Sequence, residues 1–510
     1  MEKREAIDFI VGRLSAGETG LEQIKREASK RYNVPRMVRN PEILAAFPED
    51  RLTPEISRLL IKKPRKTASG VTPVAVMVKP QGSCRHNCVY CPYTGLAAKS
   101  YVGYEPAALR GRQYGFDPYL QSLNRTNQYR GGGHATDKCE VIVMGGTFLG
   151  MRPSYREWFI KGVYEGLNGE RSSSLDEAMR KNENSPRRAI GLTIETRPDM
   201  CSPFIDEMLG YGATRVELGV QHADDSIYRT IRRGHTVEDV VQATRNLKNA
   251  GFKVLYHIMP GLPGAGPEKD IQAVRKLFQD ECFRPDMLKI YPTLVVGGTI
   301  LKQWVDQGKY RPYSSEEAAE IISEFYRHVP EYVRVMRIQR DIPAGRISLG
   351  VTKSNLRELV EEKVREKSIN PREIRYREVR GNRPDIDSFS LRRRHYLASR
   401  GKESFLFFEN QEGLIAGFLR LRLPEESTRQ DIDRDCALVR ELHVYGPEAP
   451  ISCKGEFQHH GLGSRLLKEA EAVALESGRK RMLIISGVGA RGYYRRHGYS
   501  LSGPYMAKPL

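Results

Sequence analysis

Three cysteines near residue 90 have the spacing of metal or cluster ligands. Cys84, Cys88 and Cys91 form a C-x3-C-x2-C pattern directly after a short apolar run. A structural zinc site and an electron-transfer iron–sulfur cluster each take four protein ligands. Three thiolates on a four-iron cluster would leave one iron open, and an open coordination position is what catalysis at a metal needs. A zinc knuckle completed by His86 or a distant cysteine is the alternative.

The elements that must position these cysteines are short apolar runs that alternate with helical patterns. This alternation predicts a parallel α/β sheet, and six runs fall short of the eight strands of a closed barrel. We therefore expect a partial, six-stranded parallel α/β barrel with the cysteines at the carboxyl end of its first strand. The runs are VAVMVK (74–79), VIVMGG (141–146), IGLTIE (190–195), RVELGV (215–220), KVLYHIM (253–259) and MLKIYP (287–292).

Shifts in composition divide the chain into four parts. Residues 1–70 are basic and helical in pattern, 71–333 carry the barrel, and 401–510 form a separate mixed α/β domain. Between them lies a connector, 334–400, with 18 Lys or Arg against 9 Asp or Glu, which is +9 of the chain's +19. This surplus favours a polyanionic partner, RNA above all, while a solvated basic surface is the alternative.

Nothing in the sequence indicates a membrane or secreted protein. No apolar stretch of about 18 residues is present, which argues against a membrane-spanning helix. The first residues carry charges where a signal peptide has an apolar run, so we expect a cytoplasmic location. Disulfides are rare in that compartment, so the five other cysteines are interpreted as core or incidental thiols. They are Cys139, Cys201, Cys282, Cys436 and Cys453.

The cysteine segment, with an aromatic residue before its last cysteine (CVYCP), resembles the radical S-adenosylmethionine superfamily. S-adenosylmethionine (SAM) carries an amine and a carboxylate that could chelate an open iron. The resemblance implies a [4Fe–4S] cluster on the three cysteines and SAM beside it. The backbone of Gly145 and Gly146 would receive the methionine amine, and Glu195 and Arg197 would face the SAM zwitterion.

A second nucleotide site is indicated by QHHGLG (458–463), which places glycines at the start of an amphipathic helix. Backbone N–H groups there can approach a pyrophosphate, and the helix dipole favours its negative charge. Together with YYRRHGY (493–499), the segment resembles the GCN5-related N-acetyltransferases (GNAT), which bind acetyl-CoA. A plain helix start and a core tyrosine are the alternative.

The two domains on one chain resemble the catalytic subunit of Elongator, a family that modifies the wobble uridine of tRNA. SYVGYEP, RIQRDIPA and ISGVGARGYYRRHGY carry much of this resemblance, and the short spacer between the first two cysteines suggests a bacterial or archaeal type. It implies a radical site with Lys289 and Tyr291, and a thioester aligned by Tyr494. The residues implied to bind acetyl-CoA are Lys138, Glu441, Leu442, His443, Val444, Gln458, Gly461, Leu462, Gly463, Ser464 and Tyr494.

The same resemblance implies a reaction. A SAM-derived 5′-deoxyadenosyl radical takes a hydrogen atom from the acetyl methyl, and the carbon radical adds to carbon 5 of uridine 34. Hydrolysis of the thioester then leaves a carboxymethyl group. The N-terminal region and the connector would hold the anticodon stem-loop through its phosphates. We also expect the pantetheine arm to point toward the end of the barrel that carries Lys289 and Tyr291.

Two other functions fit the sequence. A protein lysine acetyltransferase with a structural iron–sulfur site would transfer acetyl groups to peptide without SAM. A non-enzymatic, acetyl-CoA-responsive RNA-binding protein would release CoA slowly or not at all when tRNA is present. The sequence does not identify the electron donor, the tRNA species or the oligomeric state. A homodimer is one oligomeric state that fits it.

Replacing Cys84, Cys88 or Cys91 with alanine should destroy the cluster, because two thiolates hold four irons poorly. The measurement is iron content per chain after anaerobic reconstitution, and uridine modification should fall to background with it. Cys282→Ala, which changes one of the scattered cysteines, is the control and should keep its iron. A full iron complement in any of the three variants would contradict the three-ligand interpretation.

Overall fold

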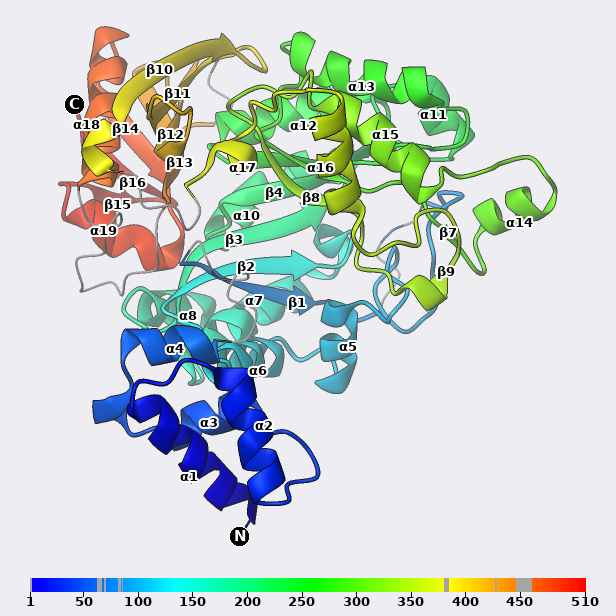
Figure 1. Cartoon of the computed structure of the whole chain (residues 1–510). Coiled ribbons are helices and arrows are strands. Elements are labelled where there is room, and N and C mark those ends of the chain that lie inside the picture. Colours follow the sequence, from blue (N-terminus) through cyan, green and yellow to red (C-terminus); the bar gives the residue numbers. More distant parts are fainter. Residues whose placement is uncertain are drawn as a thin grey trace.

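Seven parallel strands form a curled sheet at the centre of the molecule (Figure 1). The structure is a computed structural model that describes residues 2–61, 67, 70–80, 84, 86–379, 385–426, 429–445 and 461–510. The strands, in spatial order, are β1 (Thr72–Met77), β2 (Lys138–Met144), β3 (Arg188–Thr196), β4 (Arg215–Gln221), β5 (Lys253–Ile258), β6 (Met287–Ile290) and β8 (Arg334–Ile338). All neighbouring pairs are parallel, which confirms the partial α/β barrel.

The seventh strand corrects the predicted count of six. β8 lies in the segment that we expected to be the connector, and it pairs with β6. Its sequence, RVMRI, does not resemble a buried strand because two arginines interrupt the apolar residues. Val335 and Ile338 are nevertheless buried, while Arg334 pairs with Glu378 and Arg337 pairs with Asp341.

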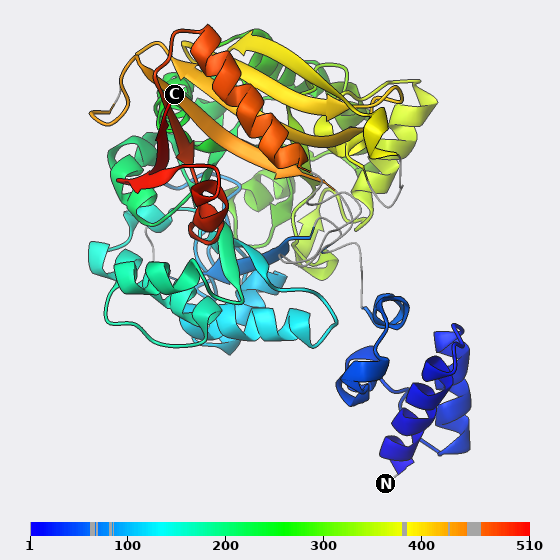
Figure 2. The same ribbon diagram turned by 90° about the vertical axis from the view of Figure 1, so that its left-hand side faces the viewer.

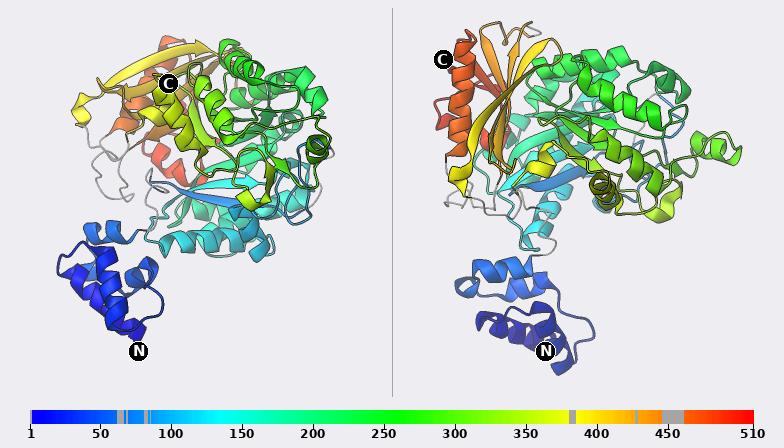
Figure 3. Two further views of the ribbon diagram at one scale, coloured as in Figure 1. Left: turned by 45° about the vertical axis from the view of Figure 1, so that its right-hand side comes forward. Right: turned by 45° about the horizontal axis from the view of Figure 1, so that its top comes forward.

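Helices connect the strands and pack against the sheet (Figures 1 and 3). α12 shows how the sequence sets them: Thr236 and Asp239 form a capping box at its start, and its apolar residues recur on the face that is buried. The helices of this domain are α5 (Pro106–Gln113), α6 (Pro118–Arg130), α7 (Pro153–Asn168), α8 (Leu175–Asn182), α9 (Pro198–Cys201), α10 (Ile205–Gly210), α11 (Asp225–Thr230), α12 (Val237–Asn249), α13 (Pro267–Gln279), α14 (Ile300–Asp306), α15 (Ser315–Phe325), α16 (Leu356–Glu366) and α17 (Ile374–Arg377). A short ribbon, β7 (Val295–Val296) with β9 (Ile347–Leu349), lies beside them.

The N-terminal residues form a separate group of helices that hangs below the rest of the chain (Figure 2). They are α1 (Glu2–Ser15), α2 (Leu21–Arg31), α3 (Asn40–Ala46) and α4 (Pro54–Leu60). Ile10, Leu14, Ile24 and Ile43 are among the residues of a core that these helices share only with one another. Within the described part of the chain, no helix is both long and apolar enough to cross a bilayer.

A second sheet stands beside the barrel (Figure 3, right). Its strands, in spatial order, are β10 (Ser390–Leu397), β11 (Gly401–Glu409), β12 (Ile415–Pro424), β13 (Cys436–Val444), β14 (Arg481–Ile485), β16 (Tyr505–Pro509) and β15 (Ser500–Ser502). Only β13 and β14 are parallel; the other pairs are antiparallel. α18 (Leu462–Glu476) lies across this sheet, and α19 (Arg491–Arg495) follows β14 (Figure 2).

A cluster of fully buried charges joins the two sheets. Arg440 on β13 donates to both carboxylate oxygens of Asp286, which precedes β6, at 2.7 Å each. It also donates to Glu403 at 2.7 Å, and Glu403 accepts from Arg422 at 2.8 Å. Lys248 lies 3.5 Å from Asp286, and burial lowers the pKa of this lysine to about 8. Because each charge is desolvated, each one depends on its partners in the other domain.

Arg440→Met should destabilise the chain by about 3–5 kcal/mol, because it leaves two buried carboxylates without their arginine. Burial alone would raise the pKa of Asp286, but Arg440 holds it below its usual value. The contribution of Asp286 is therefore present at neutral pH and is lost as the pH falls below about 4. Urea denaturation measures the free energy of unfolding of the variant and of the parent protein. Arg327→Met, at an exposed ion pair, should change stability by less than about 0.5 kcal/mol; an equally small loss for Arg440→Met would refute this role.

Candidate active site

The three cysteines lie together on the loop that follows β1, beyond the carboxyl end of the strand. Cys88 is buried, and Cys84 and Cys91 are half-buried. The N–H of Cys91 donates to the carbonyl of Cys88 at 3.0 Å, which turns the chain tightly between them. Burial raises the pKa of the Cys91 thiol to about 12, so a bound metal would be needed to hold it as thiolate at neutral pH.

Cations surround this loop and fit an anionic thiolate cluster. Buried Arg233 directs its Nη1 toward the sulfur of Cys88 at 3.6 Å, and Lys99 donates to the carbonyl of Cys84 at 3.5 Å. His86, the alternative fourth ligand, points its Nε2 toward a carboxylate oxygen of Asp199 at 3.4 Å. Three sulfur donors in a cationic setting suit an iron–sulfur cluster with one open iron.

The residues expected to hold SAM lie next to this loop. A Cβ on Gly145 would approach Cγ2 of Val78 to 2.2 Å, and Gly146 has φ +64°, so both positions favour glycine. Gly145 is buried, and its N–H donates to a carboxylate oxygen of Glu195 at 3.5 Å. Glu195, at the end of β3, accepts from Tyr101 at 2.6 Å. The glycines and this carboxylate fit the amine of an amino acid.

Arg197 is bound more firmly to the protein than the sequence indicated. Its Nε donates to Asp199 at 2.9 Å, and its Nη2 donates to the carbonyl of Arg233 at 2.8 Å. Nη1 is buried without a hydrogen-bond partner among the described residues. The two N–H groups of Nη1 are therefore left for the carboxylate of a zwitterion.

Lys289 and its partners form a charged layer on the concave face of the sheet. Lys289 of β6 is ion-paired with Glu217 of β4, although β5 lies between these strands, so the contact crosses the inside of the barrel. His257 Nε2 lies 2.8 Å from the same carboxylate, and its ring meets Tyr291 edge-on at 5.3 Å. Burial alone would raise the pKa of Glu217, but Lys289 and His257 hold it below its usual value.

Glu217 was missed by the sequence reasoning. Glu217 lies in RVELGV, an apolar run that predicts a buried strand, and its side chain is fully buried. A carboxylate in such a run is the signal that could have found it, because buried charges need partners. Glu217 is the residue that gathers Lys289, His257 and Arg215.

The second domain contributes a cavity of about 620 Å³. β13 and β14 stay paired only as far as Val439 and Ile484, and β13 continues beside β12 alone. The splayed strands open the cavity, and the first turn of α18 borders it. A Cβ on Gly463 would approach the Tyr493 hydroxyl to 2.8 Å, so a larger residue there would require this side chain to shift. This cradle at a helix start fits the pyrophosphate and pantetheine of CoA.

The structure brings together most of the residues expected to bind acetyl-CoA. The cavity is lined by Lys138, Glu441, Leu442, His443, Val444, Gly461, Leu462, Gly463, Ser464 and Tyr494. Tyr494 is buried, and this burial raises the pKa of its hydroxyl. Gln458 lies outside the described residues.

The cavity lies at the opposite end of the barrel from the one against which we expected the second domain to pack. The barrel wall of the cavity consists of strand beginnings, among them Lys138, Arg215, Lys253 and Arg334, each the first residue of its strand. Figure 1 shows the strands running away from the second domain, so the cysteines lie at the far end. The sequence shows which residues follow a strand, but it does not show which end a second domain covers.

Arg215 stands between the cavity and the charged layer. It is buried, lines the cavity, and is ion-paired with Glu140 of β2 and, at 3.5 Å, with Glu217. Glu140, Arg215, Glu217 and Lys289 thus form a continuous polar column inside the barrel. This column joins the two halves of the candidate site.

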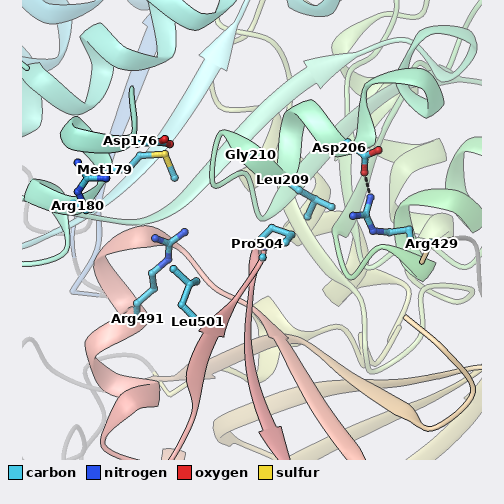
Figure 4. Close-up of a pocket in the computed structure, with 11 residues that line it drawn as sticks. Asp176, Met179, Arg180, Asp206, Leu209, Gly210, Arg429, Arg491, Leu501 and Pro504 are labelled. Carbon is cyan, nitrogen blue, oxygen red and sulfur yellow. Dashed lines mark hydrogen bonds and ion pairs between the residues drawn. The ribbon is translucent and has the colours of Figure 1, made fainter. Parts of the chain in front are cut away.

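Another cavity, of about 520 Å³, contains none of the expected residues (Figure 4). It lies between α8 and α10 on one side and the turn after β15 on the other. Arg429 is ion-paired with Asp206 there, and Arg491 extends from α19 toward it. The candidate active site therefore consists of the cysteine loop, the column and the larger cavity, and it does not include this cleft.

Family models cover nearly the whole chain. They are the radical SAM superfamily (residues 78–277), its C-terminal domain (285–366), the ELP3 N-terminal domain (4–68) and the acetyltransferase (GNAT) family (370–499). These matches confirm the radical SAM and GNAT assignments of the two sheets.

Three comparisons extend over most of the chain. The tRNA uridine(34) acetyltransferase of Methanocaldococcus jannaschii is 44% identical over 99% of this chain and 97% of its own length. Elongator complex protein 3 of Homo sapiens is 40% identical over 99% of this chain and 96% of its own. The solved structure of Methanocaldococcus infernus Elp3 lacking residues 1–46 superposes with a TM-score of 0.78 at 44% identity, covering 87% of this chain and all of that one. The chain therefore belongs to the family of Elongator complex protein 3 and the tRNA uridine(34) acetyltransferases.

Proposed function

We propose that this protein converts uridine 34 of tRNA to a carboxymethyl derivative, with acetyl-CoA as the source of the two carbons. The observation that carries the proposal is the shared cavity, whose walls come from the splayed β13 and from the strand beginnings of the radical SAM barrel. One acetyl thioester bound there faces both domains. Relatives named tRNA uridine(34) acetyltransferase support the choice of substrate.

Each cofactor has residues suited to hold it. Cys84, Cys88 and Cys91 would ligate a [4Fe–4S] cluster, and Gly145 and Gly146 with their neighbours would bind SAM. When bound, cluster and SAM supply a 5′-deoxyadenosyl radical, the oxidant that removes a hydrogen atom from the acetyl methyl. The protein's own task is to bring that methyl to within about 3–4 Å of the radical carbon and to exclude water.

The polar column indicates how the acetyl group would reach the radical site. The acetyl group would enter the barrel from the end that Arg215 and Glu140 border, while SAM would bind at the opposite end. Lys289, His257 and Tyr291 lie between these ends, where the substrates must meet. Glu217 positions two of these three by direct ion pairs.

For tRNA, the exposed part of the connector offers the better contacts. Arg346 is exposed and stacks on the ring of Tyr104 at 3.7 Å, a surface suited to phosphate or base. Arg340 instead donates to the carbonyl of Ser100, and Arg337 is paired with Asp341. The N-terminal helices would extend the same surface.

Of the alternatives, protein lysine acetylation leaves the cysteine loop and the polar column without a role. A non-enzymatic RNA-binding protein leaves the column equally unexplained. Two statements stay predictions from the sequence: the cytoplasmic location and the homodimer.

Arg346→Ala should weaken tRNA binding and make it less dependent on salt. Each phosphate that the protein no longer neutralises reduces the slope of log K against log salt by about 0.7–0.9. Binding isotherms at several salt concentrations measure this slope. Arg327→Ala removes an exposed arginine outside the connector and should leave the slope unchanged. Equal slopes for both variants and the parent protein would place the RNA elsewhere.

The proposed reaction is tested with acetyl-CoA that carries deuterium in its methyl group. Anaerobic reaction with SAM, a reductant and tRNA should place deuterium in 5′-deoxyadenosine, as measured by mass spectrometry. Cys88→Ala is the matched control and should form no 5′-deoxyadenosine. Unlabelled 5′-deoxyadenosine from the parent protein would show that the methyl is not the site of abstraction.

A further inference from the structure

His443 lies in the part of β13 that has left β14, and its side chain borders the shared cavity. Its ring stacks on Phe418 with centroids 5.9 Å apart and contacts Tyr445 at 4.4 Å. Nε2 is buried and has no hydrogen-bond partner among the described residues. A buried polar nitrogen without a partner is costly, so its retention beside a ligand cavity points to a role with the ligand or with water.

The other candidate bases around the cavity are already bound to partners. Glu441 accepts from Arg420 at 2.7 Å, and Glu140 is ion-paired with Arg215. His497 shares a hydrogen bond of 3.3 Å with the Ser464 hydroxyl. Nε2 of His443, by contrast, has no hydrogen-bond partner among the described residues.

The surroundings keep this imidazole neutral. Burial lowers the pKa of His443 to about 4, and this effect outweighs the carboxylates Glu441 and Glu378 that face it. Arg334 and Lys253, at the beginnings of two barrel strands, oppose protonation as well. At neutral pH the ring is therefore uncharged and able to accept a proton, while a pKa this far below neutral makes it a weak base.

The proposed reaction needs such a group after the radical step. Once the acetyl carbon has joined uridine, a thioester still links the base to CoA. Since α18 and the splayed β13 hold the CoA portion, this thioester remains beside β13 while it is cleaved. A neutral base on β13 is placed to activate the attacking water.

We propose that His443 is the general base that hydrolyses the tRNA–acetyl–CoA thioester, an inference that rests on the proposed function. Nε2 takes a proton from water as the water oxygen bonds to the thioester carbon. The carbon–sulfur bond breaks, and the proton passes from His443 to the departing CoA sulfur. One water and one thioester give one carboxylic acid and one thiol, with no change in oxidation state.

The test compares two steps of one reaction in His443→Phe, which keeps an aromatic ring between Phe418 and Tyr445 but has no nitrogen. Deuterium transfer from labelled acetyl-CoA to 5′-deoxyadenosine should continue. Release of CoA should slow by about 100-fold, within the usual range for a lost general base. Nuclease digests of the tRNA should then contain a uridine that still carries the acetyl–CoA thioester, and hydroxylamine should convert this species to a hydroxamate.

His443→Gln, which keeps polarity but not basicity, should accumulate the same adduct, and His328→Gln, outside the cavity, should not. Thermal unfolding checks that each variant is folded. CoA release at the parent rate in both His443 variants would overturn the proposal. A parallel loss of deuterium transfer and CoA release in folded variants would also overturn it, since His443 would then position acetyl-CoA. Absence of deuterium transfer in the parent protein would instead refute the proposed function itself.

Discussion

The buried charge cluster around Arg440 is the constraint on which the arrangement of the two domains depends. An arginine that binds one carboxylate from the barrel and one from its own sheet cannot be satisfied if either moves. A hydrophobic interface would tolerate sliding, whereas desolvated ion pairs fix both distance and angle. The cluster holds the splayed end of β13 against the strand beginnings, and the shared cavity exists only in that arrangement. Chemistry between two cofactors on different domains requires this precision, because a misplacement of about 1 Å can cost about 100-fold in rate.

The role of the polar column inside the barrel depends on the same arrangement of the two domains. With acetyl-CoA at one end and the cysteine loop at the other, the interior must be polar enough to admit a thioester and ordered enough to exclude water. Alternating charges on β2, β4 and β6 meet both needs, because each charged side chain is ion-paired with one of opposite charge. Glu217 holds the centre of this arrangement, with Arg215 on the cavity side and Lys289 on the side of the cysteines.

The sequence predicted the barrel from apolar runs and the cysteine loop from its ligand spacing, and both are local patterns. Most of the residues expected to bind acetyl-CoA came instead from the family resemblance, and the structure places them around one cavity. It did not predict β8, whose sequence contains two arginines, or Glu217, two of whose partners lie on β5 and β6, far along the chain. It also gave the wrong end of the barrel for the second domain. That choice is made by Asp286, Glu403 and Arg440, and no local pattern links residues so far apart.

The net charge counted along the sequence overstates the number of unpaired positive charges that could bind RNA. The connector's surplus suggested a uniformly basic surface, yet Arg372, Arg377 and Arg394 all surround Glu331, and Arg393 pairs with Glu469 and Glu476. Pairing reduces the field of an arginine beyond a Debye length of about 8–10 Å, as at Arg393 with its two glutamates, but three arginines that share Glu331 keep a net positive charge. Attraction to a phosphate backbone then depends on the arginines that remain exposed, such as Arg346. A few well-placed cations near the cysteine loop favour a stem-loop held in one position over a strand that slides across a broad basic face.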